Sequence, residues 1–282
     1  TMAATSKTES SVPVPHPPIA IASDADFASS GFPGTGIPGD EYMIINYEII
    51  TTTGEGISIS GTTKHFIIAG CYIDAKFDGI VIKSVADGTA GIYNNTLNNC
   101  GIDVESSNEV EIEDNTITNT GVGIGVWAYY SNRSTIKENN ITQHLYGIHF
   151  NLSHANEIYC NLLQNSTSYG VWFFLSENNT VFNNTFVGNN VGTTGSQASD
   201  EHAVYNVFST NYWSDWSGLA DYAIDGSTGS RDSNPLSCPP RCAPTPWTYT
   251  CISYEITSGF YGVLVITSVL FLTIIWKRRR TK

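Results

Sequence analysis

Basic side chains are scarce in this 282-residue chain, which has 13 Lys and Arg against 26 Asp and Glu. Five of those 13 bases fall within residues 277–282, so the rest of the chain is more acidic than the net charge of -13 indicates. An acidic surface repels phosphate groups. The composition therefore excludes nucleic acid as an expected partner.

Soft metal ligands are also few. The sequence holds 2 Met and 6 His, and the histidines are scattered along the chain. Copper sites need several Met, His or Cys side chains in one place, so we expect no copper site. The segment from Asp225 to Asp232 lacks the EF-hand spacing and is expected to be a plain turn. We therefore expect no metal and no other cofactor.

Helical periodicity is absent between Gly56 and Asn190, where no window shows a 3.6-residue apolar stripe. The stretch instead repeats a short phrase, glycine-apolar-any-apolar, every 22 to 24 residues, beginning at Gly56, Gly79, Gly101, Gly123, Gly147 and Gly170. Such a period is typical of a solenoid, because each unit is too small to bury its own apolar face. Apolar residues alternate with period two between turn residues. The sequence predicts an all-β fold, a parallel β-helix of about seven to nine coils.

A second phrase places asparagine half a period later in five successive repeats, at Asn95, Asn115, Asn139, Asn161 and Asn184. Asparagine tolerates the left-handed backbone region and bonds to neighbouring main chain, so it suits a sharp turn between two strands. At a coil spacing of about 4.8 Å the amides can bond to one another along the solenoid. We predict a structural ladder of these five side chains.

The flanks of the repeat differ from it in composition. Residues 1–17 are rich in Ser, Thr and Pro and predict a flexible leader. Residues 18–236 are expected to form the β-helix, with a cap at each end. Ser23 and Asp26 resemble a capping box for a short helix with Phe27 inward, and the aromatic cluster around Trp213 is expected to plug the far end. Residues 237–255 contain Cys and Pro and predict a stiff stalk.

Residues 256–276 are 21 residues without a charge. As a helix they would span about 31 Å, the thickness of a bilayer core. The basic tail at residues 277–282 follows at once, which favours a membrane span over a buried core helix and places the C-terminus in the cytoplasm. We therefore predict a single-pass protein of the cell membrane with an extracellular N-terminal domain.

An extracellular domain makes sequons and cysteines informative. Seven Asn-x-Ser/Thr sequons are candidate glycosylation sites, at Asn94, Asn132, Asn140, Asn151, Asn165, Asn178 and Asn183. Two of the three clustered cysteines are expected to form a disulfide, leaving one for an intermolecular bridge: Cys238, Cys242 and Cys251. The other three are expected to be apolar fillers of the solenoid: Cys71, Cys100 and Cys160.

Alternation in the first strand of each coil predicts two outward columns. The first holds Ser58, Val81, Asp103, Gly125, His149 and Trp172. The second holds Ser60, Lys83, Glu105, Trp127, Asn151 and Phe174. Aromatic rings stack on sugar rings and carboxylates bond to hydroxyls, so a mixed face of this kind favours carbohydrate. We predict binding contacts from Trp127, Asn151, Trp172 and Phe174.

Catalysis is an alternative reading of the same face. Asp103 and Glu105 are two residues apart on one strand, about 6.6 to 7 Å by strand rise, which is within the range of glycosidase carboxyl pairs. A lyase would instead need a base, for which His149 or Lys83 is the local candidate. Acidic side chains on the outward face of an acidic protein are usually only solvated. We therefore favour a protein that is not an enzyme.

Several segments resemble NosD-like right-handed parallel β-helix repeat proteins, in particular archaeal cell-surface versions with a C-terminal membrane anchor. The resemblance covers about residues 18–236 and rests on the entry Gly31–Gly36, the Asn-Asn-Thr repeats and the exit Asn211–Trp216. It implies a right-handed solenoid and, for NosD itself, a periplasmic accessory role in copper-enzyme maturation. Related β-helix proteins of the pectin lyase superfamily cleave polysaccharides on the first-strand face.

These observations lead to one expectation and two alternatives. We expect a membrane-anchored extracellular surface scaffold or recognition subunit, which contacts glycans or belongs to a larger envelope or membrane assembly with protein partners. The first alternative is a polysaccharide lyase or glycoside hydrolase. The second is a NosD-like accessory protein for metalloenzyme maturation.

Overall fold

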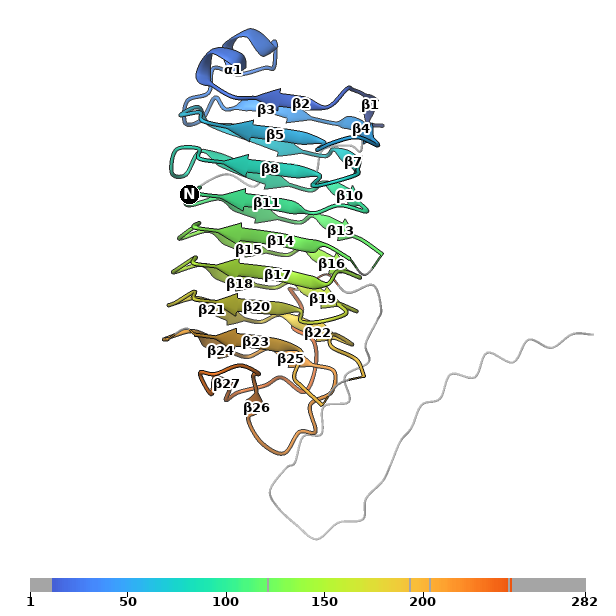
Figure 1. The fold of residues 1–282 in the computed structure, drawn as a ribbon, viewed down its shortest axis with the longest axis vertical. Coiled ribbons are helices and arrows are strands. Elements are labelled where there is room, and N and C mark those ends of the chain that lie inside the picture. Colours follow the sequence, from blue (N-terminus) through green and yellow to red (C-terminus); the bar gives the residue numbers. More distant parts are fainter. Residues whose placement is uncertain (1–11, 121, 193, 203, 243, 245–282) are drawn as a thin grey trace, which may run out of the picture. The chain divides into compact units, whose positions relative to one another are not determined.

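The computed structural model describes residues 12–120, 122–192, 194–202, 204–242 and 244. Its strands form three sheets that are stacked coil upon coil into a solenoid (Figure 1). Each coil contributes one strand to each sheet, so that β5, β8, β11 and β14 are consecutive neighbours in one sheet. The prediction of an all-β parallel solenoid is confirmed, with about eight coils in the described part, as counted in the 8-stranded sheet.

Three sheets line the solenoid, and almost every strand pair is parallel. The first sheet contains β1 (Val14–Pro15), β4 (Tyr47–Thr51), β7 (Tyr72–Ala75), β10 (Thr96–Asn98), β13 (Thr116–Thr118), β16 (Asn140–Thr142), β19 (Leu162–Gln164), β22 (Thr185–Val187) and β25 (Tyr212–Trp213). The second sheet contains β2 (Ile19–Ile21), β5 (Ile57–Ser60), β8 (Ile80–Lys83), β11 (Ile102–Glu105), β14 (Ile124–Tyr129), β17 (Tyr146–Asn151), β20 (Val171–Phe174) and β23 (Ala198–Glu201). The third sheet contains β3 (Tyr42–Ile45), β6 (Phe66–Ala69), β9 (Ala90–Tyr93), β12 (Glu111–Glu113), β15 (Thr135–Lys137), β18 (Glu157–Tyr159), β21 (Thr180–Phe182), β24 (Val207–Ser209), β27 (Arg231–Asp232) and, antiparallel to β27, β26 (Tyr222–Ala223).

Asparagine side chains stack at the corner between the third and first sheets. In each step the side-chain oxygen accepts from the main-chain N–H and the side-chain amide of the asparagine one coil earlier, as between Asn139 and Asn115, where both distances are 2.9 Å. The same pattern joins the five predicted asparagines and continues to Asn211. Asp232 ends the ladder by accepting from the N–H and the amide of Asn211 and from the indole of Trp213. These bonds satisfy polar groups that the turn would otherwise bury unpaired.

Both ends of the solenoid are covered. At the N-terminal end, Ser23 caps α1 (Asp24–Ser30) by accepting from the N–H of Asp26, and Phe27 is fully buried, as the capping-box pattern predicts. At the other end, the ring of Trp213 stacks on Phe186 and on Tyr222, with 4.1 Å between ring centroids in both pairs. Coverage of this kind keeps the apolar core of the terminal coils away from water.

The solenoid begins earlier in the chain than its sequence predicts. Val14 and Pro15 pair with Tyr47 and Glu48 as β1, so the solenoid begins before residue 18 and the flexible leader does not extend to residue 17. No helix in the described residues is both long enough and apolar enough to cross a membrane. The predicted span at 256–276 and the basic tail at 277–282 lie outside the described residues.

Candidate functional site

The outward face of the second sheet carries the candidate site, and its register differs from the predicted one. Asp103 pairs with Trp127, Trp127 with His149, and His149 with Trp172, so these four side chains share one column. The prediction that Gly125 stands beside Asp103 in this column is wrong. Likewise, Tyr129 and not Trp127 lies beside Glu105 in the second column.

The register error has a simple cause in the turn before β14. The glycine that stacks between Gly101 and Gly147 is Gly125. A Cβ added to Gly101 would overlap the carbonyl oxygen of Ile124, and a Cβ added to Gly125 would lie 2.5 Å from the carbonyl oxygen of Gly147, so the main chains of successive coils are in close contact at these glycines. Gly123 has instead a left-handed backbone, with φ of 82°, and belongs to the turn. The coil is thus two residues longer than the repeated phrase indicates, and Trp127 moves next to His149.

Aromatic rings are packed together on β17 and β20. The imidazole of His149 stacks on the indole of Trp172, with 4.2 Å between centroids and 12° between planes. The ring of Tyr146 lies 5.6 Å from His149 and 4.7 Å from Trp172. Together with their neighbours on the same face these rings form what we call the aromatic face, which comprises Trp127, Tyr129, Tyr146, His149, Tyr169, Trp172 and Phe174.

Polar atoms of this face are buried without hydrogen-bond partners within the described residues. They are both ring nitrogens of His149, the indole nitrogens of Trp127 and Trp172, and the side-chain oxygens Oδ1 of Asp103 and Asn151. A native protein has only a few such groups, and each needs an explanation. His149 is 8% exposed, and burial lowers the pKa of its imidazole to about 4, so the ring is neutral at pH 7 and has one donor and one acceptor nitrogen.

Carboxylates border the aromatic face toward the N-terminal end. Burial, with the charges of Asp78 and Glu105, raises the pKa of Asp103 to about 7. Burial followed by the charge of Glu55 also raises the pKa of Asp78. Glu105 forms an ion pair with Lys83 on the neighbouring strand, with 2.7 Å between Nζ and Oε2. We call Glu55, Asp78, Asp103 and Glu105 the acidic end of the face.

The positions just before the repeat glycines were missing from the predicted site. Tyr146 and Tyr169 precede Gly147 and Gly170, and the main chain of this position is paired from coil to coil. Asp78 stands at the equivalent place before Gly79 in an earlier coil. The signal available in the sequence is thus an acidic residue before Gly79 and a tyrosine before Gly147 and before Gly170, whereas Cys100, which precedes Gly101, is buried.

Large apolar residues continue the face around the corner toward the third sheet. Tyr130, Leu152 and Leu175 follow β14, β17 and β20, and all three have left-handed backbones with φ of 51°. Ser84 and Ser106, which follow β8 and β11, have the same left-handed conformation, so it is a regular feature of this corner. Tyr130 is 50% exposed and Leu175 is 39% exposed, so the corner adds an apolar rim to the face.

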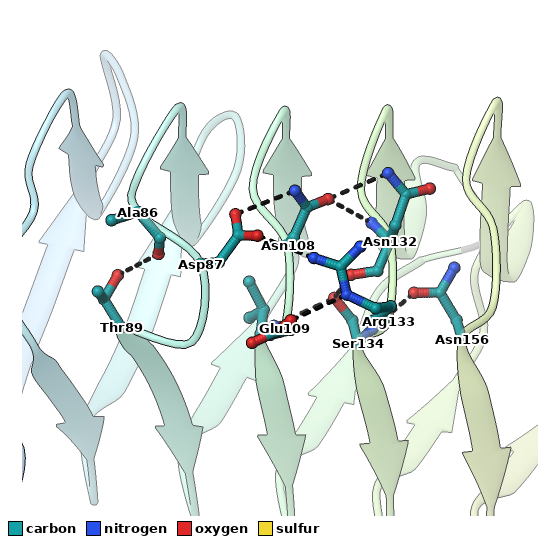
Figure 2. A network of polar contacts seen from close by, with 10 residues as sticks. Ala86, Asp87, Thr89, Asn108, Glu109, Asn132, Arg133, Ser134 and Asn156 are labelled. Atoms are coloured by element: carbon teal, nitrogen blue, oxygen red, sulfur yellow. Dashed lines mark hydrogen bonds and ion pairs between the residues drawn. The ribbon is translucent and has the colours of Figure 1, made fainter.

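A polar network occupies the loops next to this rim, between the second and third sheets (Figure 2). The guanidinium of Arg133 donates to Glu109 and to Asp87, both at 2.8 Å. The side-chain oxygen of Asn108 accepts from the N–H and the amide of Asn132. The charge of Arg133 is therefore already compensated by two carboxylates.

The sequons differ in accessibility. Asn94, Asn165 and Asn178 are exposed, whereas Asn132, Asn140, Asn151 and Asn183 are half-buried. Asn132 is held in the network described above, and Oδ1 of Asn140 and of Asn151 is buried. Glycosylation of the seven sites stays a prediction, and the exposed sites are the ones that a glycosyltransferase could reach without disturbing the fold.

The prediction that Cys160 is an apolar filler is wrong, because Cys160 is paired with Cys242. These two form a disulfide with 5.3 Å between their Cα atoms, so Cys160 is not a free apolar filler and Cys242 does not pair within its own cluster. The physical reason is that the chain after β27 returns along the solenoid, where the sulfur of Cys242 also lies 4.0 Å from the carbonyl oxygen of Asn183. Cys71 and Cys100 are buried and free. Cys238 is also disulfide-bonded, and Cys251 lies outside the described residues.

Within the described part of the chain, no three His, Cys, Asp or Glu side chains are grouped as a metal site would require. Cys71 and Cys100 face the core, and burial raises the pKa of both thiols, which disfavours the thiolate form that binds metals. The described residues therefore do not fit a copper ion.

This geometry defines a class: a parallel β-solenoid with an aromatic outward face and an acidic end. Residues 34–218 match the family model described as "Periplasmic copper-binding protein (NosD)", so the chain belongs to the NosD family. No curated protein shows significant similarity to it. A similar solved structure is the A-module of mannuronan C-5 epimerase AlgE4 from Azotobacter vinelandii, with 12% identity and a TM-score of 0.41. The match covers 70% of this chain and 62% of that one, less than two thirds of its length.

Proposed function

We propose that this NosD-family solenoid is a recognition protein that contacts glycans through its aromatic face. The observation that carries the proposal is the set of buried, unpartnered polar atoms among stacked rings around His149 and Trp172 within the described part of the chain. Sugars offer flat apolar faces to such rings and hydroxyl groups to such atoms, and a hydroxyl is both donor and acceptor. A ligand of this kind would satisfy groups that the protein itself leaves unpaired.

We further propose that the protein acts at the outer surface of the cell membrane, with residues 256–276 as its anchor. The Cys160–Cys242 disulfide supports this location, since disulfides persist in oxidising compartments. The apolar composition of residues 256–276 and the basic run after them support the anchor and its orientation. A rigid rod held in this way also suits lateral contacts with protein partners in an envelope assembly.

Replacing Trp172 with alanine should weaken oligosaccharide binding by about tenfold, because it removes the ring against which His149 is stacked and one indole donor. The full chain in mild detergent would be titrated calorimetrically with hexasaccharides. Phe182→Ala is a matched control, since Phe182 is in a stacked aromatic pair with Tyr159 on the third sheet, with centroids 4.8 Å apart. Equal losses in both variants would contradict the proposal.

Glycoside hydrolysis at the acidic end is a second candidate function. It is favoured by the contrast between Asp103, whose pKa is raised to about 7 by burial, and Glu105, which is ion-paired with Lys83. This chemistry needs one carboxyl group as an acid and a second as a base or nucleophile, and burial of Asp103 favours its protonated form, as the acid requires. Their i, i+2 spacing on β11 of about 6.6 to 7 Å is compatible with it.

The hydrolase hypothesis predicts that Asp103→Asn and Glu105→Gln each lower the release of reducing ends from a bound oligosaccharide by about 100-fold or more. Glu177→Gln, a carboxylate substitution outside the face, should leave the rate unchanged. If the wild-type protein binds oligosaccharides but releases no reducing ends, the recognition function remains and this second function is excluded.

A further inference from the structure

The unpartnered polar atoms of the aromatic face include both donors and acceptors, so they fit a ligand that both donates and accepts hydrogen bonds. The indole N–H groups of Trp127 and Trp172 can only donate, and the buried Oδ1 of Asn151 can only accept. His149 is neutral and contributes one donor and one acceptor. Hydroxyl groups meet both needs, whereas carboxylate and sulfate groups offer acceptors alone.

The charges next to these atoms are unfavourable for anions. Burial raises the pKa of Asp103, and the carboxylates of Asp78, Glu105 and Glu55 raise it further, whereas Lys83 lowers it. Lys83 is held by Glu105 at 2.7 Å, and Arg133 beyond the rim is held by two carboxylates (Figure 2). A ligand carboxylate at the acidic end would thus meet like charges, while the bases beside the face are already compensated.

From this arrangement we infer that the aromatic face accepts an uncharged glycan chain and excludes polyuronates and sulfated glycans. The inference rests on the proposed glycan contact and adds the ligand class to it. Repulsion between like charges near a protein surface is strong enough to change an affinity by about tenfold. The charge of the acidic end is therefore large enough to decide between ligands of similar shape.

The test is calorimetric titration of the full chain in mild detergent with cellohexaose, mannohexaose and N-acetylchitohexaose, and with hexamannuronate and hexagalacturonate, all at the same low ionic strength. We expect at least one uncharged hexasaccharide to bind, and each uronate to bind at least about tenfold more weakly. A uronate that binds as tightly as the best uncharged ligand would overturn the inference while leaving glycan contact intact. If none of the five binds, the proposed function itself fails.

A charge variant separates local repulsion from the acidity of the whole protein. Asp78→Asn removes one carboxylate of the acidic end and should strengthen uronate binding about threefold or more, with a smaller effect on the uncharged ligand. Glu157→Gln removes the same charge on the exposed surface of the third sheet and should leave both affinities unchanged. Equal effects of the two variants, or no effect of Asp78→Asn, would contradict exclusion by the acidic end.

Discussion

Replacing Asn139 with alanine should lower the free energy of unfolding by about 3–5 kcal/mol. The side-chain oxygen of Asn139 accepts from the N–H and the amide of Asn115, and its amide donates to the carbonyl oxygens of Ile112 and Lys137 and to Asn161. Asn139 is fully buried, so truncation leaves several polar groups without either protein or water as a partner. Urea denaturation of the full chain in mild detergent, followed by circular dichroism, would measure the loss.

Two further variants show whether the loss comes from the ladder. Asn139→Asp keeps the size of the side chain but removes its donors and places a carboxylate against two carbonyl oxygens, so it should destabilise at least as much as alanine. Asn140→Ala alters the adjacent residue, whose Oδ1 has no partner within the described residues, and should cost less than about 1 kcal/mol. Wild-type stability in Asn139→Asp would show that the amide bonds contribute little.

The ladder and the solenoid could be predicted because both follow from the repeat itself. A coil of 22 to 24 residues cannot bury its apolar face alone, so the period determines the architecture. The turn residue of each coil recurs in register, so the asparagines must stack if the coils do. The capping box at Ser23 and Asp26 could also be predicted, because it depends only on two residues three positions apart in the sequence.

The composition of the site was harder to predict, because it depends on register across one irregular turn. A two-residue difference between Gly123 and Gly125 moves Trp127 from the neighbourhood of Glu105 to that of Asp103 and His149. Alternation along a strand assigns a face but not a partner, and a shift by two residues keeps the face while it changes every neighbour. The burial of His149 and the pairing of Lys83 with Glu105 likewise depend on which coils are adjacent.

The disulfide illustrates a different limit, since spacing within the sequence favours pairing among Cys238, Cys242 and Cys251. Cys160 and Cys242 are 82 residues apart and meet only because the chain beyond β27 turns back along the solenoid. The sequence alone does not show where the chain beyond β27 runs along the solenoid. The contact joins the segment after the last strands to the corner between β18 and β19, several coils earlier.

Removing this disulfide should lower the free energy of unfolding by about 4–5 kcal/mol, because a closed loop of this length strongly restricts the unfolded chain. Cys242→Ala is the informative variant, since Cys242 is exposed and its truncation removes little packing. The loss should appear as a lower urea midpoint of the full chain under non-reducing conditions. Peptide mapping of the wild type should recover the fragments containing Cys160 and Cys242 as one cross-linked species.

The double variant Cys160→Ala/Cys242→Ala tests whether the two residues act as a pair. If their contribution is the cross-link, the double variant should be about as stable as Cys242→Ala alone, apart from about 1 kcal/mol for the side chain lost at buried Cys160. Additive losses of similar size would indicate two independent packing effects. A Cys242→Ala protein as stable as the wild type, or a wild type without the cross-linked peptide, would show that the segment after β27 is not held against the solenoid at Cys160.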